Sequence, residues 1–353
     1  MINLIAPINT LGYGVAGYNI LKELYKIDNS VSLYPISQPQ DFEGEELYAA
    51  ISNQERCLID RPCVKIWHQN DLTTRVGNGK FIGFPIFELN KFNAKEITSL
   101  HHCNKIFVCS KWAKQIILQN TKFKDEDVHV VPLGVDNDIF SPSAVSGRQS
   151  TVFFNCGKWE KRKGHDILLE CFNESFSEND DVELWMMCDN PFIGEGNKNW
   201  QDLYKNSELG SKIRIIPRQK THQDVMSIMR QADCGVFPSR AEGWNLELLE
   251  MMAMGKNVIA TNYSAHTEFC NSENSKLIDI NNLETAFDGV FFDGTIGMWA
   301  EICDEQKQQT IEHMQNIHWA KQNNELQVNT AGIATGEKFS WKNSVQELIN
   351  ELP

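Results

Sequence analysis

The chain has 353 residues, of which 41% are hydrophobic and 23% charged, and its formal net charge is −14. This composition is typical of a folded protein of about two domains and excludes a disordered or fibrous protein. The negative charge argues against a nucleic-acid partner, because such binding depends on Lys and Arg side chains that neutralise phosphates. No apolar run reaches the roughly 20 residues that span a bilayer, and the N-terminus lacks the basic start of a secretory signal. We therefore expect a cytoplasmic protein without a transmembrane segment.

Short apolar segments alternate with segments of helical period along nearly the whole chain. In the first half, we expect strands at 2–6, 31–36, 64–68, 81–85, 105–109 and 128–133, and helices around 14–27, 90–101 and 110–119. After a turn-rich segment at 132–150, we expect strands at 151–156, 182–188, 213–217, 234–238 and 257–260. This alternation predicts an α/β fold built of two domains with parallel sheets. The amphipathic pattern of the last residues predicts a final helix.

The sequence "LGYGVAG" at 11–17 places Gly12, Gly14 and Gly17 at the spacing of a dinucleotide-binding loop. Two departures count against NAD: "PINTL" separates the first strand from Gly12, and no acid follows the second strand before Asp41. Two interpretations stay open. The glycines either let the backbone approach a phosphate at a helix start, or serve only the packing of a tight turn.

A cluster of four cations lies just after the expected domain boundary, in "KWEKRKG" at 158–164. Because residues 151–353 carry 18 basic and 31 acidic side chains, a local cation cluster there indicates a specific anion site. We expect Lys161 and Arg162 to be solvated surface charges. The ten cysteines form no C-x-x-C pair, which predicts free, mostly buried thiols and no metal site.

The segment "PSRAEGWNLELLEMMAMGKNVIA" contains two glutamates eight residues apart, Glu242 and Glu250. Glu242 follows a strand and a short turn, and a helix that opens at "GWN" presents unpaired backbone N–H groups to a phosphate or a sugar oxygen. Glu250 lies about two turns into that helix among apolar residues, so we expect it to have a hydrogen-bond partner. For Glu247, on the same helix face, we favour a role at the helix dipole over ligand contact.

These segments together resemble the retaining glycosyltransferases of family 4, within the GT-B superfamily. "PSRAEGWNLELLEMMAMGKNVIAT" is similar to the family's E-x7-E region and "NCGKWEKRKGHDILLECF" to its phosphate-binding segment. "VPLGVDNDIFSP" is similar to the family's interdomain stretch, "VCSKWAKQIIL" to the helix that precedes that stretch, and "LGYGVAGYNIL" to the glycine-rich loop, and all matches follow the family's order.

The resemblance implies two Rossmann-like domains that face a cleft. We expect an acceptor-side domain at 1–145, a nucleotide-sugar domain at 150–335, and a last helix at 340–353 that crosses back to the first domain. It also implies transfer of a sugar from a nucleotide-sugar to an acceptor hydroxyl, with retention of anomeric configuration and without a metal or other cofactor. The acceptor, whether a glycan, a lipid-linked molecule or a protein, stays open.

The resemblance also assigns roles to individual residues. Lys158 and Lys163 map onto the basic pair that binds the diphosphate, and Glu242 maps onto the acid that contacts the donor sugar. Glu250 maps onto the acid that binds ribose hydroxyls. The other expected donor contacts are Gly12, Gly14, Gly243, Trp244, Asn245 and Leu246. Three positions depart from the family: Lys158 replaces the usual Arg, and Asn245 and Glu247 stand where Gly and Pro are frequent.

Two residues of the first half are further candidates. His68 follows an expected strand, where it would lie near the donor sugar or have only a structural role. Glu88 also follows a strand and would bind acceptor or donor, or begin a helix. Four other functions stay open: a nucleotide-sugar epimerase, a glycan phosphorylase, an NAD-dependent oxidoreductase and a non-catalytic sugar-binding protein.

Overall fold

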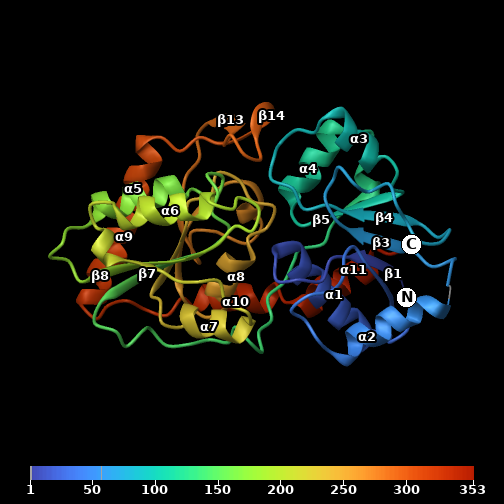
Figure 1. The fold of residues 1–353 in the computed structure, drawn as a ribbon, viewed down its shortest axis with the longest axis horizontal. Coiled ribbons are helices and arrows are strands. Elements are labelled where there is room, and N and C mark those ends of the chain that lie inside the picture. Colours follow the sequence, from blue (N-terminus) through green and yellow to red (C-terminus); the bar gives the residue numbers. More distant parts are fainter. Residues whose placement is uncertain (1, 57) are drawn as a thin grey trace. The chain divides into compact units, whose positions relative to one another are not determined.

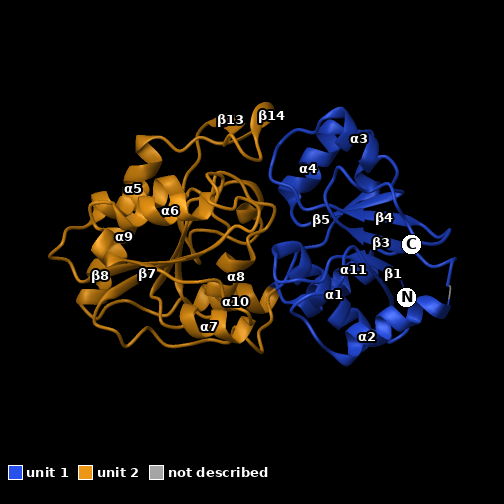
Figure 2. Ribbon diagram, viewed as in Figure 1, with its two compact units in different colours: residues 1–134, 339–353 blue, residues 135–338 orange. Residues whose placement is uncertain are grey.

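The computed structural model describes residues 2–56 and 58–353. These form two compact units, one of residues 1–134 and 339–353 and one of residues 135–338 (Figure 2). The boundary lies inside the turn-rich segment but before the expected residue 145. The reason is that the residues just after 134 already bind the second unit: the backbone N–H and the hydroxyl of Ser143 both donate to the carbonyl of Met254, at 3.1 and 3.2 Å.

The first unit is built on a parallel sheet of six strands in the order β2-β1-β3-β4-β5-β6 (Figure 1). All six strands were expected from the sequence, and they run from Asn3–Ala6 (β1), Ser32–Pro35 (β2), Cys63–Ile66 (β3), Phe81–Phe84 (β4), Lys105–Val108 (β5) and Val128–Val130 (β6). Three of the strands, β1, β3 and β4, are buried along their whole length, and β5 is buried from Ile106 onward. Near-continuous apolar runs of this kind are typical of a parallel sheet that is covered on both faces.

The helices of the first unit connect its strands, apart from the last one. Their bounds are Gly12–Ile27 (α1), Glu45–Ser52 (α2), Ala94–Leu100 (α3), Lys111–Asn120 (α4) and Trp341–Asn350 (α11). Helix α11 contacts α1, with Trp341, Val345 and Leu348 buried on one face. The hydroxyl of Ser340 caps this helix by accepting from the N–H of Asn343.

The second unit repeats the architecture with a parallel sheet in the order β12-β11-β10-β7-β8-β9. Its strands are Thr151–Gly157 (β7), Val182–Cys188 (β8), Ile213–Ile215 (β9), Cys234–Phe237 (β10), Asn257–Thr261 (β11) and Lys276–Ile278 (β12). The helices are His165–Ser175 (α5), Gly196–Lys205 (α6), His222–Met229 (α7), Leu246–Ala253 (α8), Asp304–Gln322 (α9) and Thr330–Lys338 (α10). Two six-stranded parallel sheets therefore confirm the expected α/β fold.

A separate antiparallel hairpin in the second unit was not expected from the sequence. It consists of Leu283–Phe287 (β13) and Asp293–Ala300 (β14), with an irregularity in register between Thr285 and Phe287. Figure 1 shows the hairpin apart from the six-stranded sheet of its unit.

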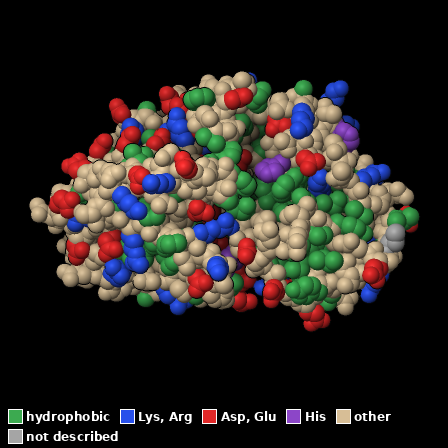
Figure 3. Space-filling view, in the orientation of Figure 1, with side chains coloured by type: hydrophobic (Ala, Val, Ile, Leu, Met, Phe, Trp, Pro, Cys, Tyr) green, Lys and Arg blue, Asp and Glu red, His purple; other side chains and the backbone are tan. Residues whose placement is uncertain are grey.

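The surface and the thiols agree with most of the composition-based expectations. On the face drawn in Figure 3, basic and acidic side chains are interspersed over the second unit, so its negative charge forms no single patch there. Among the described residues, no helix combines the length and the apolar character that a membrane crossing requires. The nine described cysteines are free and seven are buried, but Cys303 is exposed; Cys57 lies outside the described residues.

Candidate functional site

The candidate site of the second unit lies at the carboxyl ends of two neighbouring strands. Strand β10 pairs with β7 through Cys234–Phe153 and Gly235–Phe154, so the segments that follow the two strands meet at one edge of the sheet. The chain builds outward from β7 through β8 and β9 on one side, and from β10 through β11 and β12 on the other. Ligands of open α/β sheets bind at such a point, where the strand order reverses.

Glu242 and the cationic segment meet directly at this edge. The ammonium of Lys163 lies 3.0 Å from Oε1 of Glu242, and Nη1 of Arg162 lies 2.8 Å from its Oε2. The hydroxyl of Ser239 also donates to Oε1, at 2.9 Å, and the N–H of Glu242 donates to the hydroxyl of Ser264. Both carboxylate oxygens are therefore bound, and the sequence expectation that Glu242 and Lys163 share one site agrees with this contact.

The network continues from Arg162 to a second carboxylate, Glu160. The Nε and Nη2 atoms of Arg162 lie 3.0 and 2.7 Å from Oε2 of Glu160, and the ammonium of Lys158 lies 2.7 Å from its Oε1. The expectation that Arg162 is a solvated surface charge is therefore wrong: it is 3% exposed, and its Nη1 also donates to the carbonyl of Ala241. Three cations and two carboxylates alternate in one continuous ion-pair network.

The ion pairs outweigh burial in setting the pKa values of Glu242 and Lys163. Burial alone would raise the pKa of the Glu242 carboxyl, but Lys163 and Arg162 outweigh burial and hold that pKa well below its usual range. Burial would likewise lower the pKa of Lys163, yet the charge of Glu242 raises it. The site therefore keeps fixed charges in an environment from which water is largely excluded.

Glycine and a neutral histidine shape the loop that carries the cations. Gly157 has a φ of +141°, and a Cβ there would lie 3.1 Å from Cε of Lys163, so the lysine stem occupies the space a side chain would need. Burial lowers the pKa of His165 to about 3. The neutral ring accepts from the N–H of Glu160 at Nδ1, and its Nε2 lies 3.0 Å from Oδ1 of Asn155. The loop is thereby tied to strand β7.

Asn245 starts helix α8 in a backbone conformation that favours glycine. Its φ is +87°, and its side-chain oxygen caps the helix by accepting from the N–H of Leu248. The side-chain amide of Asn245 also donates to Nε2 of the buried His266, at 2.9 Å, because burial lowers the pKa of His266 to about 4 and leaves this nitrogen free to accept. The N–H groups of the helix's first residues have no partner within the helix. The backbone of Gly243 to Leu246 thus precedes and opens α8 next to Glu242.

Glu250 lies in the second turn of α8 and differs from Glu242 in its surroundings. It is 8% exposed, and within the described part of the chain its carboxyl forms no hydrogen bond or ion pair. The expectation of a protein hydrogen-bond partner for Glu250 is therefore wrong. Burial raises the pKa of Glu250 well above its usual value, and the nearby charges of Glu247 and Asp136 raise it further.

The glycines of the first unit lie at the start of α1, after the carboxyl end of β1. A Cβ on Gly14 would come within 2.3 Å of the Asn9 carbonyl, and one on Gly17 within 2.3 Å of the Pro7 carbonyl. Close packing against the preceding loop therefore requires both glycines. Gly12 differs, because no atom lies within 4 Å of its would-be Cβ, so the space above it is open.

Aromatic rings surround the other candidate of the first unit, His68. Tyr13 lies between Gly12 and Gly14, and its ring centroid is 4.6 Å from that of His68 and 5.5 Å from that of Trp67. The Tyr13 hydroxyl donates to the carbonyl of Ile86 and accepts from its N–H. This contact connects the start of α1 to the loop that also carries Glu88, so the carboxyl ends of β1, β3 and β4 share one region. Tyr13 was not expected at this site, and its position between two glycines in "LGYG" is the sequence feature that marks it.

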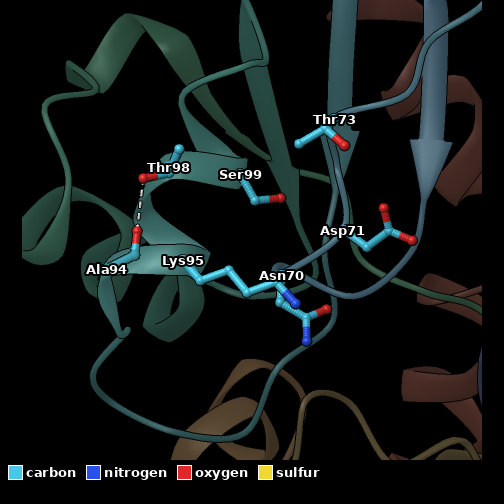
Figure 4. Close-up of a pocket in the computed structure, with 7 residues that line it drawn as sticks. All are labelled: Asn70, Asp71, Thr73, Ala94, Lys95, Thr98 and Ser99. Carbon is cyan, nitrogen blue, oxygen red and sulfur yellow. Dashed lines mark hydrogen bonds between the residues drawn. The ribbon is translucent and has the colours of Figure 1, made fainter.

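An open pocket of about 600 Å³, lined mostly by polar residues, lies close to His68 in the sequence (Figure 4). Its lining comes from the segment after β3 and from helix α3, and consists of Asn70, Asp71, Thr73, Ala94, Lys95, Thr98 and Ser99. Figure 4 shows Lys95 reaching across from α3 toward Asn70. The sequence had given no indication of this pocket, because its polar residues follow no motif.

Comparisons with known proteins agree with this architecture. Residues 150–290 match the family described as glycosyl transferases group 1. A glycosyltransferase of Haemophilus influenzae without a characterised activity is 22% identical over 82% of this chain and 84% of its own length. Among solved structures, a glycosyltransferase from Rickettsia africae has a TM-score of 0.70 at 15% identity, covering 99% of this chain and 96% of that one. Anabaena HepE, solved in complex with UDP and glucose, has a TM-score of 0.67 at 14% identity, covering 99% and 98%.

Proposed function

We propose that this chain, a glycosyltransferase of the GT-B fold with its group 1 region at residues 150–290, takes its sugar from a nucleotide-sugar bound in the second unit. The transfer retains the anomeric configuration and needs no metal. The observation that carries the proposal is the buried ion-pair network in which Lys158, Lys163 and Glu242 meet at one sheet edge.

The cations suit the leaving group of such a donor. A departing nucleoside diphosphate develops negative charge, and preorganised cations in a water-poor site stabilise that charge strongly. Lys163 supplies a fixed cation, and Lys158 supplies a second whose side chain stays 36% exposed. The N–H groups at the start of α8 that Asn245 does not bind add donors for phosphate or sugar oxygens.

The two glutamates suit two different groups of hydroxyls. Glu242, held ionised by its partners, accepts hydrogen bonds from hydroxyls of the donor sugar beside the diphosphate. Among the described residues the Glu250 carboxyl has no hydrogen-bond partner, so ribose hydroxyls would satisfy a buried polar group that is otherwise costly. By the family resemblance, the leaving phosphate oxygen then takes the proton of the acceptor hydroxyl on the same face of the sugar.

We place the acceptor in the first unit. His68 and Glu88 follow strands β3 and β4, and the pocket lined by Asp71, Lys95 and Thr98 offers both donors and acceptors of hydrogen bonds. Such a lining suits a hydroxyl-bearing molecule. Gly12 leaves the space above the start of α1 open.

A nucleotide-release screen tests the proposal. UDP-, GDP- and ADP-sugars are incubated with the protein, with and without pooled acceptors, and the free nucleoside diphosphate is measured. We expect acceptor-dependent release from one donor class and its loss in Lys163→Met, while the control Lys161→Met keeps it. Binding of NAD(H) without release would favour an oxidoreductase. Isomerisation of the donor without release would favour an epimerase, and a requirement for inorganic phosphate a phosphorylase. Binding of the donor with no release under any condition would favour a sugar-binding protein.

A further inference from the structure

The β13–β14 hairpin is tied to the candidate site through Arg240, which lies two residues before Glu242. The N–H of Ala300, at the end of β14, donates to the carbonyl of Arg240, and Nε of Arg240 lies 3.1 Å from Oε1 of Glu284 on β13. The same oxygen accepts from Nε1 of the buried Trp299, at 2.9 Å. The base of the hairpin is therefore bound to the loop that carries Glu242.

Arg240 also ties this assembly to the start of α5. Its Nη1 and Nη2 donate to the two carboxylate oxygens of Asp166, at 2.8 and 2.9 Å, and its Nη1 donates to the carbonyl of Lys161. A bidentate pair of this kind fixes direction as well as distance. The position of the hairpin is thus set by the same segment that holds the cations.

The tip of the hairpin brings an aromatic ring to Lys158. The ammonium of Lys158 lies 5.7 Å from the ring centroid of Phe291, and 5.6 Å from that of Phe192, in the loop after β8. Both rings are large apolar groups left partly in solvent, at 45% and 60% exposure. Exposed aromatic side chains from two separate segments thus converge on one cation of the ion-pair network.

A lysine at this position needs support that an arginine would not. Its ammonium is a compact charge on a flexible stem, whereas an arginine presents a planar fork that is already oriented for phosphate. Glu160 fixes one side of the ammonium, and aromatic rings within about 6 Å attract a cation and limit its freedom.

We propose that the β13–β14 hairpin is part of the donor site, and that Phe291, together with Phe192, positions Lys158 for the diphosphate. The inference rests on the proposed function and adds two positioning residues to it. The aromatic faces leave one side of the ammonium open, since the Lys158 side chain keeps 36% of its exposure. That open side is where a phosphate oxygen binds.

Calorimetric titration tests the role of the rings. Wild-type protein is titrated with UDP, GDP and ADP, and the nucleoside diphosphate that binds best is used with each variant. We expect Phe291→Ala to weaken its binding by about 3- to 10-fold, the range of a partly exposed cation–aromatic contact. Phe291→Leu should weaken nucleoside diphosphate binding as much as Phe291→Ala does, and Phe291→Tyr should bind as tightly as the wild type. The matched control Phe287→Ala removes another exposed ring of the same hairpin and should bind as the wild type does.

A double-mutant cycle separates positioning from a general effect on the fold. In a Lys158→Met background, Phe291→Ala should cause no further loss, because the cation that the ring positions is gone. An equal loss in both backgrounds, or wild-type binding by Phe291→Ala, would overturn the inference. If the wild type binds no nucleoside diphosphate and Lys163→Met changes nothing, the proposed function fails as well. Nucleoside diphosphate binding that depends on Lys163 but not on Phe291 would refute the role of the hairpin and leave the proposed function intact.

Discussion

The loop before α8 and the second turn of α8 each bury a carboxyl group, and they treat it in opposite ways. Glu242 has two cations and a hydroxyl within hydrogen-bond distance, so its pKa lies below the usual range despite burial. Glu250 has no partner in the part of the chain that the structure describes, and burial raises its pKa. Two acids eight residues apart are therefore prepared for different tasks.

The difference indicates which carboxyl has its hydrogen bonds made by the protein before any ligand binds. Removing one partner from a buried ion pair is strongly destabilising, so the Glu242 network contributes to folding as well as to binding. A buried carboxyl without a partner instead costs stability, and such sites persist where function needs them.

The largest effect should come from breaking the network at its centre. Arg162→Met leaves Glu160 and Glu242 without their shared guanidinium, and we expect a loss of about 3–5 kcal/mol in the free energy of unfolding. Urea unfolding measures it. The neighbouring control Lys161→Met should stay within about 0.5 kcal/mol of the wild type. Equal free energies of unfolding for Arg162→Met and wild type would show that the network does not stabilise the fold.

Replacing the ionised acid should act mainly on turnover. Glu242→Gln keeps the shape but removes the charge, and we expect sugar transfer to fall by about 10²-fold or more, the scale of one preorganised contact. Measured release of nucleoside diphosphate at saturating donor gives this ratio.

The same variant changes the dependence of stability on pH. Because Lys163, Arg162 and His266 lower the pKa of Glu242 in the folded state, its stabilisation is present above the unfolded pKa and is lost as the pH falls through the folded value. The wild type should therefore lose more stability on acidification than Glu242→Gln. Parallel acid profiles would contradict the assignment.

The contribution of Glu250 to stability should depend on pH in the opposite direction. The folded pKa of Glu250 is raised by burial, Glu247 and Asp136, so its contribution is most favourable below the unfolded pKa and is lost as the pH rises. At neutral pH, we expect Glu250→Gln to increase the free energy of unfolding by about 0.5–2 kcal/mol and to weaken nucleotide binding. A loss of stability at neutral pH would mean that the carboxyl has a partner.

The smallest effect concerns the residue that starts α8. Asn245→Gly removes the cap but accepts the positive φ without strain, and we expect a change of only about 0.5 kcal/mol. Asn245→Ala loses the cap and keeps the strain, so it should cost about 1–2 kcal/mol more. Chemical unfolding of both variants checks this order, and equal costs would mean that backbone strain plays no part.

The sequence predicted every strand of the two parallel sheets except β12, and it predicted that the segments of Lys163 and Glu242 meet. Apolar runs such as "VELWMMC" predict buried strands because a parallel sheet is covered on both faces. The meeting of two segments about eighty residues apart came from the family's motif order, and the pairing of β7 with β10 gives its physical reason.

The burial of charges could not be predicted in the same way. Glu160 and Arg162 stand in a run of alternating charges that is typical of a solvated loop, and only their contacts across the network, including Glu242, remove them from water. The residues next to Arg162 in the sequence do not indicate that it pairs with Glu242, which lies 80 positions away. The hairpin did leave a signal: Asp-Gly pairs at 288–289 and 293–294 flank its tip, and such pairs are common at hairpin turns.

A crystal structure of the protein with a nucleoside diphosphate, UDP first, would show directly where the diphosphate binds. We expect phosphate oxygens within hydrogen-bond distance of the Lys158 and Lys163 ammonium groups, and ribose hydroxyls on the carboxyl of Glu250. A diphosphate bound away from the β7 and β10 edge, with the lysines still facing only Glu160 and Glu242, would contradict that expectation.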